Sequence, residues 1–135
     1  MIKEKIYDCI TFYNENFLTN LRFEILNNVV DYFIVCESKF DHKGIPKPIN
    51  FFLTNNKFKD KVRHVVIEEQ FPELKNGWLA ESYQREKIFN GIVDASDEDY
   101  ILFSDSDEIP NPKKLENLSI NNNLLFFSKI FMFIK

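Results

Sequence analysis

Short apolar runs alternate along the chain with longer amphipathic stretches. The runs at 6–12, 29–36, 62–67 and 100–103 have the length and the β-branched and aromatic residues typical of buried strands. Two prolines soon after the fourth run prevent its extension, and residues 113–118 are expected to form a short helical turn. The pattern therefore predicts four strands.

Two amphipathic stretches, 17–28 and 79–93, predict the helices that connect these strands. In the first helix, the residues expected to face the core are Leu18, Leu21, Ile25 and Leu26. Those expected to face solvent are Asn20, Arg22, Glu24 and Asn27. Glycine and proline mark 40–50 and 71–78 as loops. The first strand, helix and second strand form a βαβ unit, which predicts a parallel, right-handed pair.

The alternation of strands and helices predicts an α/β fold with a mostly parallel, Rossmann-like sheet flanked by helices. A length of 135 residues is typical of one domain, so residues 1–135 are expected to form a single domain. The net charge is −4 and no cluster of Lys or Arg occurs, which argues against nucleic acid as a partner.

Polar side chains follow three of the predicted strands. Asn14 and Glu15 come after the first strand, Glu37 after the second, and the acidic segment 105–108 after the fourth. Because ligands of parallel sheets bind at the carboxyl ends of the strands, we expect these side chains to form one site.

The segment after the fourth strand carries Asp105, Asp107 and Glu108 within four positions. Carboxylates this close repel one another unless a positive charge lies among them. Mn²⁺ or Mg²⁺ would supply that charge and would bridge the carboxylates to a diphosphate. The alternative is a solvated acidic loop, because the Asp-x-Asp pattern is common by chance.

The sequence also indicates where the chain resides. The N-terminus has no apolar signal segment, and the apolar stretch 124–134, a strand or a helix by its spacing, is too short to span a bilayer. We therefore expect no transmembrane segment and a cytoplasmic protein, peripheral to a membrane at most. Cys9 and Cys36 fall within apolar runs and are expected to be buried, reduced thiols.

Several stretches match the pattern of a known family in order and spacing. They are IYDCITFYNE at 6–15, VVDYFIVCES at 29–38, GIPKP at 44–48, KVRHVV at 61–66, the set Trp78, Glu81, Gln84 and Arg85, and SDSDEIP at 104–110. On these stretches the chain resembles glycosyltransferase family 17 from about residue 6 to residue 112.

The resemblance implies a GT-A-like fold and a metal-dependent transfer of a sugar, with N-acetylglucosamine as the expected group. The implied donor is a UDP-sugar, the metal is Mn²⁺ or Mg²⁺, and the acceptor is a glycan or a lipid-linked oligosaccharide. Members of the family continue well beyond the acidic segment. We therefore expect this domain to be incomplete at its C-terminus, with a partner chain or a further C-terminal region covering the tail.

The resemblance also strengthens roles for individual residues. Asp107 is expected to bind the metal directly, with Asp105 on the metal or the ribose, and Glu108 is grouped with Asp107 as catalytic. The residues expected to bind the donor nucleotide are Thr11, Asn14, Glu15, Glu37, Arg85 and Asp105.

Each of these roles has a structural alternative. Asn14 and Glu15 would also suit the start of a helix. Glu37 would also fit a solvated strand end, and Arg85 would pair with Glu81 four positions earlier on the same helix. For the whole chain, the alternative function is a truncated, non-catalytic module that binds a nucleotide, a metal or a partner. A phosphotransferase is less favoured because the sequence has no glycine-rich phosphate loop.

Overall fold

The computed structural model describes residues 3–72 and 77–116, which form a four-stranded, all-parallel sheet. The strands are β1 (Ile6–Phe12), β2 (Tyr32–Ser38), β3 (Val62–Ile67) and β4 (Tyr100–Ser104). Their order across the sheet is β3-β2-β1-β4, so β1 pairs with both β2 and β4. The predicted α/β class is confirmed, although β2 starts at Tyr32 rather than at residue 29.

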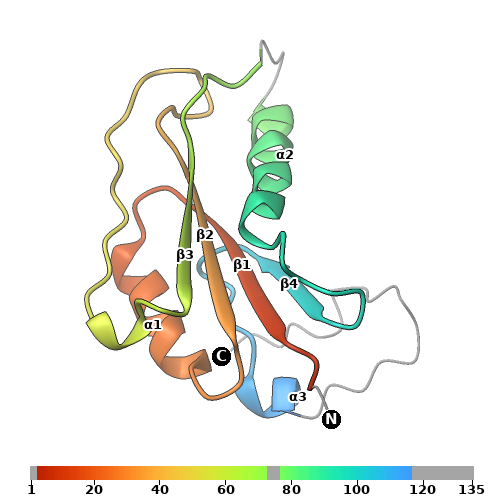
Figure 1. Cartoon of the computed structure of the whole chain (residues 1–135). Coiled ribbons are helices and arrows are strands. Elements are labelled where there is room, and N and C mark those ends of the chain that lie inside the picture. Colours follow the sequence, from red (N-terminus) through yellow and green to blue (C-terminus); the bar gives the residue numbers. More distant parts are fainter. Residues whose placement is uncertain (1–2, 73–76, 117–135) are drawn as a thin grey trace.

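Helices cover both faces of this sheet (Figure 1). The elements are α1 (Asn16–Leu26), η1 (Asn56–Phe58), α2 (Gly77–Lys87), η2 (Ile88–Gly91) and α3 (Pro112–Glu116). The predicted second helix therefore ends at Lys87 and tightens into a 3₁₀ turn. No helix within the described residues is long and apolar enough to cross a membrane. The predicted element at 124–134 lies outside the described residues.

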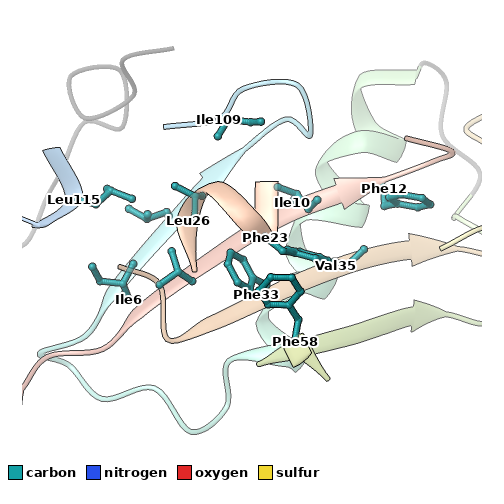
Figure 2. Close-up of a cluster of buried hydrophobic side chains, with 12 residues drawn as sticks. Ile6, Ile10, Phe12, Phe23, Leu26, Phe33, Val35, Phe58, Ile109 and Leu115 are labelled. Atoms are coloured by element: carbon teal, nitrogen blue, oxygen red, sulfur yellow. The ribbon is translucent and has the colours of Figure 1, made fainter. Parts of the chain in front are cut away.

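Alternation of side chains along the strands produces two cores. On the face of α1, Phe23 and Leu26 pack with Ile10 and Phe33, and the loop after β2 adds Phe58 (Figure 2). On the face of α2 and η2, the buried residues are Tyr7, Cys9, Ile34, Cys36, Ile67, Ile88 and Ile92. The sheet is thus buried on both faces, as the continuous apolar runs predict.

η2 approaches the sheet closely at Gly91. A Cβ atom at this position would lie 2.8 Å from the Cγ2 of Ile34 and 3.0 Å from the Cγ2 of Val65. Glycine therefore allows the chain to turn over the sheet before it enters β4.

The predicted core face of α1 is only partly correct: Leu26 is buried and Ile25 packs against the core, as predicted, but three other positions differ. Leu21, assigned to the core, is 38% exposed, whereas Asn20 and Arg22, assigned to solvent, are 8% and 0% exposed. The helix is rotated because Arg22 finds a buried partner, Asp8, on the α1 face of β1. A buried charge is tolerated when it is paired and hydrogen-bonded, and hydrophobic spacing alone does not reveal such a pair.

The path of the chain reverses direction across the sheet at β1. From β1 the chain steps outward to β2 and β3, and then crosses back to place β4 on the other side of β1. In open parallel sheets such a switch point leaves a crevice at the carboxyl ends of the two diverging strands. Here these ends are Phe12 of β1 and Ser104 of β4.

Candidate functional site

A cleft of about 800 Å³ opens at the carboxyl ends of β1, β2 and β4. This is the size of a small-molecule site, and it lies at the switch point. The acidic side chains that line it are Glu15, Asp41, Asp105 and Asp107. The basic ones are His42, Lys43 and Lys47. The cleft therefore has charges of both signs, which would suit a metal ion on one wall and an anionic group on the other.

The acidic wall is the turn that follows β4. Asp105 and Asp107 are exposed to the cleft, and Ser106 between them is 8% exposed. The amide of Glu108 donates to the carbonyl of Asp105 at 3.0 Å, and the amide of Asp105 donates to the Glu108 carboxylate at 3.3 Å. These two bonds close residues 105–108 into a compact turn, which we call the acidic turn.

Arg22 lies beneath the acidic turn. Its guanidinium forms a bidentate pair with Asp8, with N···O distances of 2.6 and 2.8 Å. It also donates to the carbonyls of Asp105 and Glu108 at 3.2 and 2.9 Å, and to the hydroxyl of Ser104 at 2.5 Å. Neither Arg22 nor Asp8 was predicted to contribute to the site. The sequence did contain a signal for this pair. Asp8 is a charged residue within an apolar strand, and such a residue needs a buried partner.

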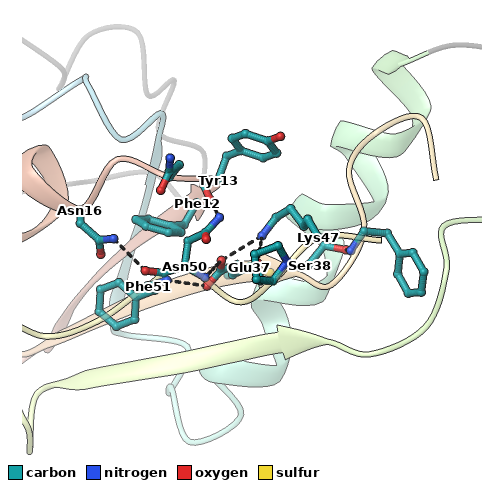
Figure 3. Close-up of polar contacts among 12 residues, drawn as sticks. Phe12, Tyr13, Asn16, Glu37, Ser38, Lys47, Asn50 and Phe51 are labelled. Carbon is teal, nitrogen blue, oxygen red and sulfur yellow. Dashed lines mark hydrogen bonds and ion pairs between the residues drawn. The ribbon is translucent and has the colours of Figure 1, made fainter. Parts of the chain in front are cut away.

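The opposite wall, which we call the basic wall, is the loop 40–50 with His42, Lys43 and Lys47. It is anchored by Glu37 (Figure 3). This carboxylate is 0% exposed and accepts from the Lys47 ammonium at 2.9 Å and from the amides of Asn50 and Phe51 at 2.6 and 3.1 Å. The Nε2 of His64 lies 3.1 Å from its second oxygen. The Lys47 side chain is 8% exposed, so this lysine is a buried partner of Glu37 rather than a solvated surface residue.

The same loop is tied to the end of β1. Asn50 donates to the carbonyl of Tyr13 at 3.0 Å, and Asn16 donates to the carbonyl of Asn50 at 2.7 Å (Figure 3). The Lys47 ammonium lies 5.4 Å from the centre of the Tyr13 ring, a cation–π contact. Tyr13 is 54% exposed and lines the cleft, so the loop and the end of β1 together form one wall.

Gln84 of α2 lines the cleft and ties the ends of β1 and β2 to His42. Its amide nitrogen donates to the carbonyls of Phe12 and Cys36 at 3.4 and 2.9 Å, and its oxygen lies 3.0 Å from the Nε2 of His42. Because the amide nitrogen is used by two carbonyls, the oxygen must be the acceptor toward His42. His42 therefore carries its proton on Nε2.

The structure brings together some of the predicted site residues. Thr11, Glu15, Asp105 and Asp107 line the cleft. Glu15 precedes α1 and accepts from the amides of Tyr13 and Asn14 at 3.0 and 3.3 Å, so it closes the loop between β1 and α1.

Four other predicted residues lie outside the lining of the cleft. Asn14 is exposed, and Glu37 is enclosed by the groups described above. Glu108 uses its carboxylate on the amide of Asp105. Arg85 is at the rim, 2.6 Å from the Glu81 carboxylate and 3.3 Å from that of Asp105, so the predicted ion pair with Glu81 is present.

The donor groups of the acidic wall are compatible with a divalent metal ion. Among the described residues, no group of three or more His, Cys, Asp or Glu side chains is arranged to hold a metal. Mg²⁺ and related ions need fewer protein ligands, because one or two carboxylates suffice when phosphates and water complete the shell. Asp105 and Asp107, both open to the cleft, provide such a pair.

The two thiols take no part in this site. Cys9 and Cys36 are buried and free, as predicted. Burial raises the pKa of Cys36 to about 12 and raises that of Cys9 as well. Both thiols therefore stay protonated at neutral pH and are poor nucleophiles.

The chain is similar to known glycosyltransferases. Residues 1–126 match the sequence model of glycosyltransferase family 17. The β-1,4-mannosyl-glycoprotein 4-β-N-acetylglucosaminyltransferases of Rattus norvegicus and Homo sapiens are each 33% identical to it over 120 residues, and that of Mus musculus is 32% identical. Each alignment covers 81% of this chain and 22% of the relative, so the chain spans less than a quarter of the curated relatives it matches. No solved structure matches it significantly.

Proposed function

Because the chain belongs to glycosyltransferase family 17, we propose that its cleft binds a UDP-sugar with a divalent metal ion and serves the transfer of N-acetylglucosamine to a glycan. The observation that carries this proposal is the place of Asp105 and Asp107, which line the cleft at the switch point of the sheet. The name of the relatives supplies the transferred group. A parallel sheet with helices on both faces agrees with a GT-A-like domain.

In this proposal Asp105 and Asp107 hold Mn²⁺ or Mg²⁺, as the chemistry of their carboxylates allows. When bound, such an ion neutralises the negative charge that builds on a departing diphosphate. Asp107 is the preferred direct ligand because Asp105 also lies 3.3 Å from Arg85. Glu108 keeps the acidic turn closed through the amide of Asp105.

The opposite wall supplies groups for the nucleotide. We assign Tyr13 to stack on the uracil ring, since its exposed ring borders the cleft, and Thr11 to hydrogen-bond the nucleoside. Lys47 borders the cleft and is a fixed positive charge suited to a phosphate. Arg85, at the rim, is a second candidate for the phosphates.

Glu37 receives a different role in this proposal from the one its sequence position predicts. Its oxygens accept from protein groups and it lies outside the lining of the cleft. We assign it to position Lys47 rather than to contact the donor.

The proposal is tested by calorimetric titration of UDP into the protein, with and without Mn²⁺. We expect binding that requires Mn²⁺ and is lost in Asp107→Ala. Asp97→Ala, which removes an exposed acid on the loop before β4, is the matched control and should bind as the wild type does. No binding of UDP by the wild type under either condition would overturn the proposal.

Binding and transfer are separated by a second assay. Hydrolysis of UDP-N-acetylglucosamine can be followed by release of UDP, with water in place of the glycan acceptor. Metal-dependent release supports a transferase domain, whereas UDP binding without any release supports the non-catalytic module.

A further inference from the structure

The polar groups beneath the acidic turn form a clamp that the proposed reaction does not itself require. Its members are Arg22 of α1, Asp8 of β1, and the backbone at both ends of the turn. We propose that Arg22 is a positioning residue, which holds the acidic turn in the form that presents Asp105 and Asp107 to a metal–nucleotide complex. This inference rests on the function proposed above.

The hydrogen bonds of Arg22 go to three places: β1, the end of β4 and the acidic turn. A guanidinium has five N–H donors in a planar fork. Two of them hold Asp8, one holds the Ser104 hydroxyl, and the remaining two reach the carbonyls of Asp105 and Glu108. All five donors are used, so the orientation of the guanidinium is fixed by β1 and transmitted to the turn.

The contact with the turn is made through the backbone. Arg22 binds the carbonyls of the first and last residues of the turn, at 3.2 and 2.9 Å, and leaves the carboxylates of Asp105 and Asp107 to the cleft. A positive charge that bound those carboxylates directly would compete with a metal ion. The clamp instead fixes their backbone and occupies none of their carboxylate oxygens, of which one, on Asp105, lies 3.3 Å from Arg85.

Stability alone gives no reason to use charged residues here. Arg22 and Asp8 have side chains that are 0% and 1% exposed, and a buried ion pair of this kind can often be replaced by apolar residues without loss of stability. What apolar residues cannot replace is a pair of donors aimed at two carbonyls. The geometry therefore points to the shape of the turn as the purpose of the clamp.

The test uses a double variant, Asp8→Leu/Arg22→Met, which removes both buried charges together and leaves side chains of similar size. A second variant, Arg22→Lys, keeps the charge beside Asp8 but cannot form the fork. The matched control is Arg63→Met/Asp94→Leu, which removes another bidentate Arg–Asp pair, with N···O distances of 2.6 and 2.8 Å, between β3 and the segment after η2.

Each protein is titrated with Mn²⁺ in the presence of UDP, and free and bound Mn²⁺ are measured by electron paramagnetic resonance. Circular dichroism records folding on the same samples. Groups that orient metal ligands without touching the metal typically contribute about 10- to 100-fold in metal affinity. We expect a loss of that size in both clamp variants, with a broadened bound spectrum, and an unchanged affinity in the control.

Two different failures can be told apart. If the wild type binds Mn²⁺–UDP and a folded clamp variant binds it equally well, Arg22 is structural and the inference is wrong. If the wild type binds no Mn²⁺–UDP, the proposed function fails, and the inference fails with it. If the double variant does not fold, Arg22→Lys decides between the two roles by the same affinity and spectrum.

Discussion

The two walls of the cleft are anchored by buried ions of opposite charge. Beneath the acidic turn lies a cation, Arg22, which binds backbone carbonyls. Beneath the basic wall lies an anion, Glu37, which binds backbone amides and the Lys47 ammonium. In both walls the buried ion contacts backbone groups of the wall, carbonyls for Arg22 and amides for Glu37, so each wall is held in place from behind.

The two anchors differ in how far they are closed to solvent. Arg22 is paired with Asp8, and both side chains are almost completely buried. The partners of Glu37 are closer to solvent, with Lys47 at 8% and His64 at 26% side-chain exposure. The anchor of the acidic turn is therefore more completely closed to solvent than that of the basic wall, which agrees with the metal site proposed for the acidic turn.

Asp8→Ala should have the largest effect on stability, because it leaves the buried charge of Arg22 without its partner. Breaking one side of such a pair costs about 3–5 kcal/mol of unfolding free energy. Urea denaturation of the variant and the wild type measures this loss. A cost below about 1 kcal/mol would mean that Arg22 finds another partner or water, and that the two anchors are alike.

Glu37→Gln should cost less, about 1–3 kcal/mol, because glutamine keeps one oxygen as an acceptor for the loop and the partners of Glu37 are less completely buried than Arg22. The loss should be local. Hydrogen exchange should accelerate at the amides of Asn50 and Phe51, which donate to Glu37, and remain slow in β1. A uniform acceleration across the sheet would contradict the view that this anchor serves the loop alone.

Asp94→Asn tests the same chemistry at the surface. The hydrogen bond and charge of Arg63 lower the pKa of Asp94 to about 2, from an ordinary value of 3.8. The pair therefore stabilises the fold above pH 4 and loses this contribution as the pH falls toward 2. Because both side chains are partly exposed, we expect about 0.2–1 kcal/mol.

The measurement compares the unfolding free energies of the wild type and Asp94→Asn at pH 6 and again near pH 2. The difference between the two proteins should be present at pH 6 and vanish near pH 2. A difference that grows as the pH falls would have the wrong sign for a carboxylate with a lowered pKa.

Leu21→Ala should have the smallest effect, within about 0.5 kcal/mol, because this side chain is on the exposed side of α1. The helical spacing of apolar residues predicts the opposite, a core leucine. Thermal unfolding of Leu21→Ala beside Phe23→Ala, whose ring is buried, measures both. A loss for Leu21→Ala equal to that for Phe23→Ala would restore the predicted face of the helix.

The elements of the fold could be predicted from local pattern, and so could the edge of the sheet where the site lies. β1 and β3 have the predicted bounds because their runs are purely local signals. Collecting the strand-end residues at one edge requires only the rule that parallel strands share a direction. That rule brings Glu15, Asp105 and Asp107 to a common cleft, whereas Asn14, Glu37 and Glu108, which the same rule selects, lie outside its lining.

The anchors of the walls could not be predicted, because they depend on contacts across many residues of sequence. Asp8 and Arg22 meet only when α1 packs on β1, and Arg22 meets the acidic turn only when β4 lies beside β1. The burial of Lys47 could not be predicted either, because a lysine in a proline-containing loop carries no local signal of burial. Glu37, which follows an apolar run, has the same local pattern whether it binds a ligand or a loop.

The central claim is that a metal ion and UDP bind at the acidic turn. Nuclear magnetic resonance with Mn²⁺ and UDP tests it directly, because the paramagnetic ion broadens the amide signals close to it. We predict broadening at residues 104–108 and at Thr11–Tyr13, with no selective broadening at the exposed acids of 94–99. Selective broadening at 94–99, or none at the acidic turn with UDP and Mn²⁺ present, would contradict the claim.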